Sequence, residues 1–201
     1  MITLSELHCN PAEAFKNDQL NSILNSPPHA SWIKKHPTTK VKNDNGDMVP
    51  WEYIPIDKIE FLLLRIFQKI KIEVRSTSTM FNSVTVTIRL HYLNPIDHEW
   101  YFHDGVGAEV VQTDAGKSAA DLAAIKSAGV KMALPSAESY AVKDAAEKFG
   151  KLFGRDLNRR NTIDFVGGYS KPIETSETPQ TQPIEPPNQN ITNNFTQYDN
   201  L

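Results

Sequence analysis

Four basic residues recur between positions 148 and 159 at a spacing typical of one face of a helix. At 100° per residue, a helix predicted over residues 136–160 would place all four within roughly 80° of arc: Lys148, Lys151, Arg155 and Arg159. Such a row can neutralise nucleic-acid phosphates whatever the base sequence. It is also typical of a solvated helix face, so the row alone leaves both interpretations open.

A second basic segment, residues 34–42, holds four lysines and no acidic residue. Lys34 and Lys35 open it. Because no acidic side chain is available nearby to pair with these lysines, we count the two among the candidate phosphate contacts.

Metal chemistry is a further possibility that the sequence raises. Three histidines and two aspartates gather around one predicted hairpin: His91, Asp97, His98, His103 and Asp104. Their spacing fits no zinc or calcium motif, and strand alternation predicts His91 and His103 on the solvent face. A solvated hairpin is the favoured interpretation, and a metal-dependent nuclease using residues 91–104 is the less favoured alternative.

Composition restricts the class of protein. The chain has 201 residues, of which 39% are hydrophobic, enough for one core. It has no apolar run long enough to cross a bilayer and one cysteine, Cys9; these predict a soluble, cytoplasmic protein without disulfides. Residues 115–121 resemble a phosphate-binding loop, but Val111 stands where that loop requires glycine. We therefore expect no cofactor.

The net charge of −3 belongs to the C-terminal tail. Residues 168–201 account for one of the 21 Lys/Arg and four of the 24 Asp/Glu, so the first 167 residues hold 20 of each. The tail is rich in Pro, Thr and Asn, which predicts disorder. Residues 194–201 regain aromatic side chains and are interpreted either as an unstructured end or as a short peptide that binds a partner.

The chain is predicted to divide into three parts. Residues 1–50 are interpreted as an irregular segment with one short helix, capped by Asn10. Residues 51–167 form the core, and residues 168–201 form the tail. We expect no independent domain before residue 51, because prolines interrupt that segment repeatedly.

Within the core, the apolar period changes from helical to alternating and back. A helix is predicted over residues 58–69, with Asp57 as its cap, followed by strands at 70–74, 84–92 and 99–103. Residues from 105 onward are predicted to be helical, with helices at 121–134 and 136–160 separated by Pro135. The fold class is therefore α+β: an antiparallel meander of three to four strands packed on a long C-terminal helix.

Three segments, in this order, resemble the annealing core of the Rad-fifty-two superfamily. Residues 53–67 (YIPIDKIEFLLLRIF) resemble its tyrosine-led first helix, residues 103–107 (HDGVG) the end of its meander, and residues 137–154 (AESYAVKDAAEKFGKLFG) its long helix. The resemblance spans about residues 50–160 and is nearest to phage single-strand annealing proteins of the Sak type.

This resemblance implies a β-β-β-α core assembled into a ring of about ten or more subunits. It implies single-stranded DNA binding and ATP-independent annealing of complementary strands in phage recombination and repair. Lys58 and Lys143 are the implied DNA contacts. Asp144 and Glu147 depart from the family, which often has Arg at these positions, so we expect the basic row and residues 34–42 to compensate. Helical angle predicts that Lys143 and the basic row face different grooves.

The expected partners are single-stranded DNA and further copies of the chain. The tail would bind a host single-strand binding protein or a phage exonuclease, and no membrane or catalytic role is expected. The alternatives to annealing are a passive DNA-coating or structural phage protein, and the nuclease described above.

Overall fold

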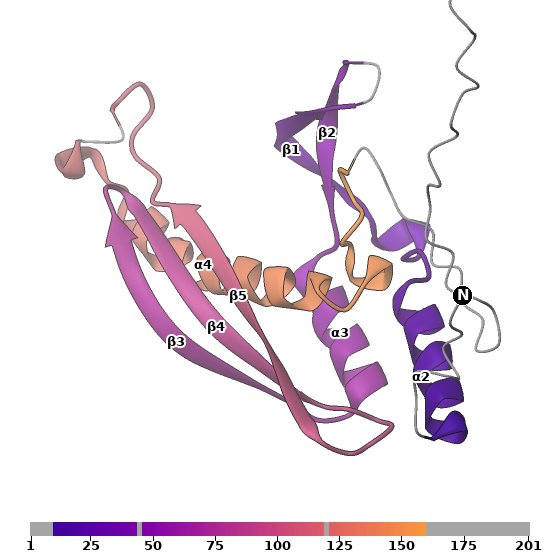
Figure 1. Ribbon diagram of the computed structural model, residues 1–201. Coiled ribbons are helices and arrows are strands. Elements are labelled where there is room, and N and C mark those ends of the chain that lie inside the picture. The colour runs from indigo at the N-terminus through magenta and orange to yellow at the C-terminus, as the bar shows by residue number, and fades with distance from the viewer. Residues whose placement is uncertain (1–9, 44–45, 119–120, 160–201) are drawn as a thin grey trace, which may run out of the picture.

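The computed structural model describes residues 10–43, 46–118 and 121–159. A three-stranded antiparallel meander packs on a long helix, and a separate two-stranded hairpin projects away from that sheet (Figure 1). In chain order the elements are α2 (Pro11–Leu24), η1 (Ala30–Trp32), β1 (Lys34–Lys42), β2 (Met48–Tyr53), α3 (Ile56–Phe67), β3 (Ile70–Met80), β4 (Ser83–Leu93), β5 (Trp100–Val110), η2 (Leu122–Ala124), α4 (Ser127–Glu147) and η3 (Lys151–Phe153).

The predicted α+β arrangement and its meander are confirmed. The sheet order is β3-β4-β5, with Ile72 opposite Leu90 and Leu90 opposite His103. Alternate residues of β4 are buried against the helices, as the period of two predicts. The strands are longer than predicted. In particular, the helical prediction from residue 105 onward is wrong for residues 105–110, which belong to β5.

Two glycines let β5 lie directly against the backbone of α4. A Cβ at Gly105 would be 2.1 Å from the carbonyl oxygen of Ala141, and one at Gly107 would be 2.0 Å from that of Ala137. The facing ridge of α4 has alanine at every fourth position, fully or almost fully buried: Ala133, Ala137, Ala141 and Ala145. Small residues on both sides therefore bring strand and helix together, and they also explain why this stretch of β5 lacks a strand signal in the sequence.

The predicted break at Pro135 is wrong, because α4 runs through it without interruption. Pro135 is exposed, whereas Ala133 and Ala137 on either side are buried against the sheet. The carbonyl that loses its helical partner, that of Lys131, lies on an exposed residue. Packing of both halves on one sheet outweighs the local cost of the proline.

The helix predicted to continue to residue 160 instead ends at Glu147. Gly150 has φ 149° and Gly154 has φ 94°, and η3 lies between them. A Cβ at Gly150 would be 2.5 Å from the carbonyl oxygen of Leu24, so glycine is required for the turn to approach α2.

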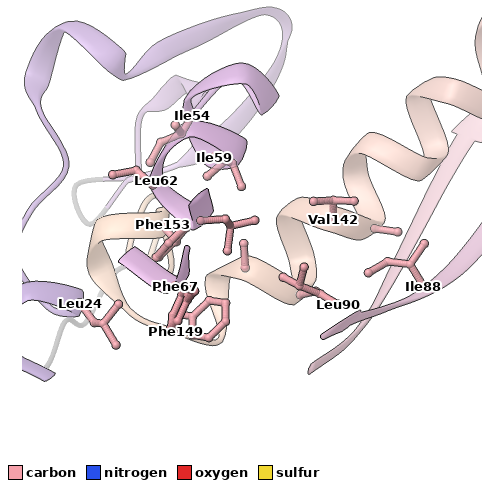
Figure 2. Close-up of a cluster of buried hydrophobic side chains, with 14 of the residues drawn as sticks. Leu24, Ile54, Ile59, Leu62, Phe67, Ile88, Leu90, Val142, Phe149 and Phe153 are labelled. Atoms are coloured by element: carbon pink, nitrogen blue, oxygen red, sulfur yellow. The ribbon is translucent and has the colours of Figure 1, made fainter. Parts of the chain in front are cut away.

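This turn carries two phenylalanines into the core (Figure 2). The ring of Phe149 lies 4.5 Å from that of Phe67 and 4.7 Å from that of Tyr92, measured between centroids. The core also takes three residues of the apolar face predicted for α3, Ile59, Leu62 and Leu63. The fourth, Ile66, is only partly buried, and Phe67 is buried beside it. The prediction that Asp57 caps α3 is wrong. Pro55 occupies the N-cap position, where no side-chain hydrogen bond is made, and Asp57 lies in the first turn.

Residues 10–43 and 46–50 contain more regular secondary structure than predicted. The short helix is confirmed as α2, with the Asn10 side chain accepting from the backbone N–H groups of Ala12 and Glu13. The basic segment 34–42 is strand β1, paired antiparallel with β2. Strand β2 spans the predicted boundary between residues 50 and 51.

Two hydrogen bonds join the hairpin to the segment after η3. The backbone N–H of Glu52 donates to Oδ1 of Asn158, and Nδ2 of Asn158 donates to the carbonyl oxygen of Glu52, each at 2.7 Å. The tail prediction, residues 168–201, lies outside the described residues. No helix within the described ranges has the length and hydropathy needed to cross a membrane.

The contact between β5 and α4 gives a direct stability test. Gly107→Ala should lower the free energy of unfolding by about 1–3 kcal/mol, because the new methyl group meets helix backbone that cannot move aside. Ala108→Val enlarges the next residue, which is exposed on the opposite face of β5, and should change stability little. Urea denaturation measures both, and equal effects would contradict this account of the contact.

Candidate nucleic-acid interface

A hollow of about 600 Å³ lies between the β1–β2 hairpin and the second half of α4. Its walls carry basic, acidic, hydroxyl and aromatic side chains. Those from the hairpin are His36, Pro37, Thr39, Trp51 and Tyr53, and those from α4 are Ser136, Ser139, Tyr140, Lys143, Asp144 and Glu147. Charge and aromatic surface are thus combined in one open site.

Lys143 is part of the α4 wall of this hollow. Its ammonium is 5.0 Å from the ring centroid of Tyr53 and 5.2 Å from that of Tyr140, within range for cation–π attraction. Burial lowers the pKa of Lys143, while the charges of Glu147 and Asp57 act in the opposite direction. The structure therefore places this predicted site residue in a concave position that it shares with the carboxylates of Asp144 and Glu147.

Two smaller hollows lie nearby and are related by shared lining residues. One, of about 220 Å³, shares Trp51, Tyr53, Lys143 and Glu147 with it and adds Arg155 and Arg159. The other, of about 340 Å³, shares Arg159 with the second and adds Lys35 and Lys42. We call these three hollows together the hairpin cleft.

For Arg155 and Arg159, the hairpin cleft contradicts the prediction that Lys143 and the basic row face different grooves; Lys148 and Lys151 do not line the cleft. That prediction required one straight helix to residue 160. Because α4 ends at Glu147 and the chain folds back at Gly150, Arg155 and Arg159 return to the same hollow as Lys143.

The predicted basic row itself does not exist, because its members do not share a helix. Lys148 donates to the backbone carbonyl of Asp104 and lies 4.0 Å from the carboxylate of Asp144. The Asp144 carboxylate accepts from the backbone N–H of Val106 at 3.0 Å. These two side chains therefore bind the outer edge of β5, and Lys148 has a structural role there.

Two other members of the predicted row are also engaged. Lys151 lies 3.4 Å from the carboxylate of Asp156, and both side chains are largely buried. Arg155 donates to the side-chain oxygen of Asn25 at 2.8 Å and lies 3.5 Å from Asp156. Of the four cations, Arg159 alone is exposed while also lining the cleft.

The remaining predicted contacts lie around the cleft. Lys58 pairs with Asp57 at 3.0 Å and is not among the cleft-lining residues, although the charge of Asp57 acts on Lys143. Lys34 stands opposite Tyr53 and Lys35 opposite Glu52 in the β1–β2 register. Successive residues face opposite sides of a strand, so the two lysines point to different faces of the hairpin.

Glu147 lines the cleft. In the sequence it stands out only because the family that the sequence resembles often has Arg at this position. Burial, followed by the neighbouring carboxylate of Asp144, raises the pKa of Glu147 to about 7, against the opposing charges of Arg159 and Lys143. Near neutral pH the cleft therefore gains or loses one negative charge.

The histidines and aspartates of the meander do not converge. His103, predicted on the solvent face, instead faces α4: its Nδ1 lies 3.3 Å from the carbonyl oxygen of Ala145, and burial lowers its pKa. His91 is on the opposite face, 3.2 Å from Glu73, and Asp104 accepts two bonds from Arg89. In the part of the chain that the structure describes, no three or more His, Cys, Asp or Glu residues gather to hold a metal ion.

Comparison with protein-family models and with curated proteins found no match for this sequence.

The raised pKa of Glu147 predicts a pH-dependent stability. Its carboxyl is protonated in the folded protein up to about pH 7 but ionises near pH 4.5 when unfolded. Its contribution to stability therefore falls as pH rises between these values. Glu147→Gln should be more stable than wild type at pH 8 by on the order of 1 kcal/mol, a figure reduced for solvent around the partly exposed group.

Thermal melts at pH 5 and pH 8 measure this effect, and the gain should shrink at pH 5. Glu138→Gln removes an exposed carboxylate from the same helix and is the matched control. A gain in stability that does not depend on pH would show that ionisation of Glu147 does not destabilise the folded protein.

Proposed function

We propose that this chain binds single-stranded DNA and anneals complementary strands without ATP. The observation that supports this most directly is the hairpin cleft, where Lys143 and Arg159 lie near exposed aromatic side chains. Phosphate neutralisation by cations and stacking on aromatic rings are the two general means of holding a single strand.

The fold around the cleft adds a second line of support. The meander and long helix have the β-β-β-α order of the Rad-fifty-two superfamily that the sequence resembles. Annealing requires that a strand be held and ordered, with no bond made or broken, and a groove of cations and aromatics suits that task. A passive DNA-coating protein would also use such a groove, but it would not speed the pairing of the bound strand with its complement.

The wider proposal comes from the same resemblance. The chain would act in phage recombination in the bacterial cytoplasm, as a ring of about ten or more subunits. The tail would bind a host single-strand binding protein or a phage exonuclease.

The cleft cations provide the test of strand binding. Lys143→Gln and Arg159→Gln should each weaken binding of an oligo-dT probe about 10-fold and reduce the salt slope by about 0.7, the value for one phosphate contact on a single strand. Lys131→Gln removes an exposed lysine from the first half of α4, away from the cleft, and should have little effect. Fluorescence anisotropy at several salt concentrations measures all three, and equal losses would exclude the cleft as the site.

Annealing distinguishes the main proposal from the passive coat. Wild-type protein mixed with complementary oligonucleotides, without ATP, should accelerate duplex formation, measured by loss of donor fluorescence between labelled strands. Binding both strands without acceleration would favour the coating protein.

Oligomeric state is a separate prediction. Light scattering at micromolar concentration should give a mass many times the 22.6 kDa of one chain. A stable monomer would remove the ring from the proposal.

A further inference from the structure

Trp51 presents an exposed indole inside the hairpin cleft. It lies on β2, its side chain lines both the first and the second hollow, and 42% of its surface is exposed. Both hollows are also lined by Lys143. A large aromatic surface and a cation therefore border the same space.

The other aromatic rings nearby already contact a cation or another ring, although 40% of the surface of Tyr140 is exposed. The Lys143 ammonium lies over Tyr53 and Tyr140, and the tryptophan before the hairpin, Trp32, packs edge-on against Phe61 at 6.1 Å. Among the described residues, no ring or cation packs on the indole of Trp51. Its face is thus available to a ligand, at the cost of apolar surface left in water.

We infer that Trp51 stacks on a base of the bound strand and makes the hairpin cleft selective for single-stranded over duplex DNA. This inference rests on the proposed function. Every base has a π-face, so such stacking tolerates any sequence. In a duplex both faces of an internal base are already stacked on neighbouring bases, so neither face is free to stack on the indole. Phosphates, in contrast, are present in both single-stranded and duplex DNA.

Neighbouring side chains in the cleft thereby have two separable tasks. Lys143 and Arg159 bind phosphates, so their contribution falls as salt rises. Trp51 contributes through the base and should be nearly independent of salt. Its loss should therefore lower affinity without changing the salt slope.

The experiment compares two probes of equal length and charge, oligo-dT and an abasic oligonucleotide, by fluorescence anisotropy. The variants are Trp51→Ala, Trp51→Phe, and Trp100→Ala as the control. Trp100 is similarly exposed, on β5 outside the cleft linings. Circular dichroism and thermal melts verify folding, and the two-probe comparison on wild-type protein remains decisive if Trp51→Ala does not fold.

We expect wild-type protein to bind oligo-dT about 5- to 100-fold more tightly than the abasic probe, the range for one stacked base. Trp51→Ala should lose that preference and keep the salt slope, Trp51→Phe should retain most of it, and Trp100→Ala should match wild type. Equal wild-type affinity for the two probes, or equal losses on both in Trp51→Ala, would overturn the inference while leaving strand binding intact. Failure of wild-type protein to bind either probe would overturn the proposed function itself.

Discussion

The close approach of β5 to α4 is the constraint on which the rest of the molecule depends. Gly105 and Gly107 have no side chains to keep the helix away, and the alanine ridge of α4 fits directly onto the strand backbone. A helix held by its backbone cannot rotate about its axis without steric overlap. With Ala141 fixed toward the sheet, Lys143 and Glu147 line the cleft beneath the hairpin. The electrostatics of the cleft are therefore set by packing on the opposite side of the same helix.

Much of the fold could be predicted because its signals are local. The alternation of β4 and the apolar face of α3 identify a buried face without any other part of the chain. Strand β1 has no such signal, because its residues are mostly polar and its pairing with β2 determines its structure. The end of α4 is also non-local: Phe149 and Phe153 have helical spacing, but the close approach of Gly150 to Leu24 selects a turn.

The candidate site was predictable only in part, for the same reason. Lys143 is predicted as a DNA contact only through the family resemblance, and it lies in the cleft. Lys148, Lys151 and Arg155 looked equally suitable as a row of charges, yet each interacts with a group that only the folded chain brings within its reach. Trp51 carries no chemical signal in the sequence, since a tryptophan in a strand is more often core. Its role depends on the folded hairpin, which places Trp51 in one hollow with residues of α4.

The engagement of β5 by Asp144 and Lys148 has a consequence for how copies of the chain can associate. An uncovered strand edge is a template on which another strand can add, and proteins commonly block such edges with charged groups. Here one N–H and one carbonyl of β5 are already bonded to side chains of the chain's own α-helical segment and its cap. Extension of the sheet from this edge would require those bonds to break. These bonds therefore disfavour the open-ended strand addition at this edge that leads to fibres.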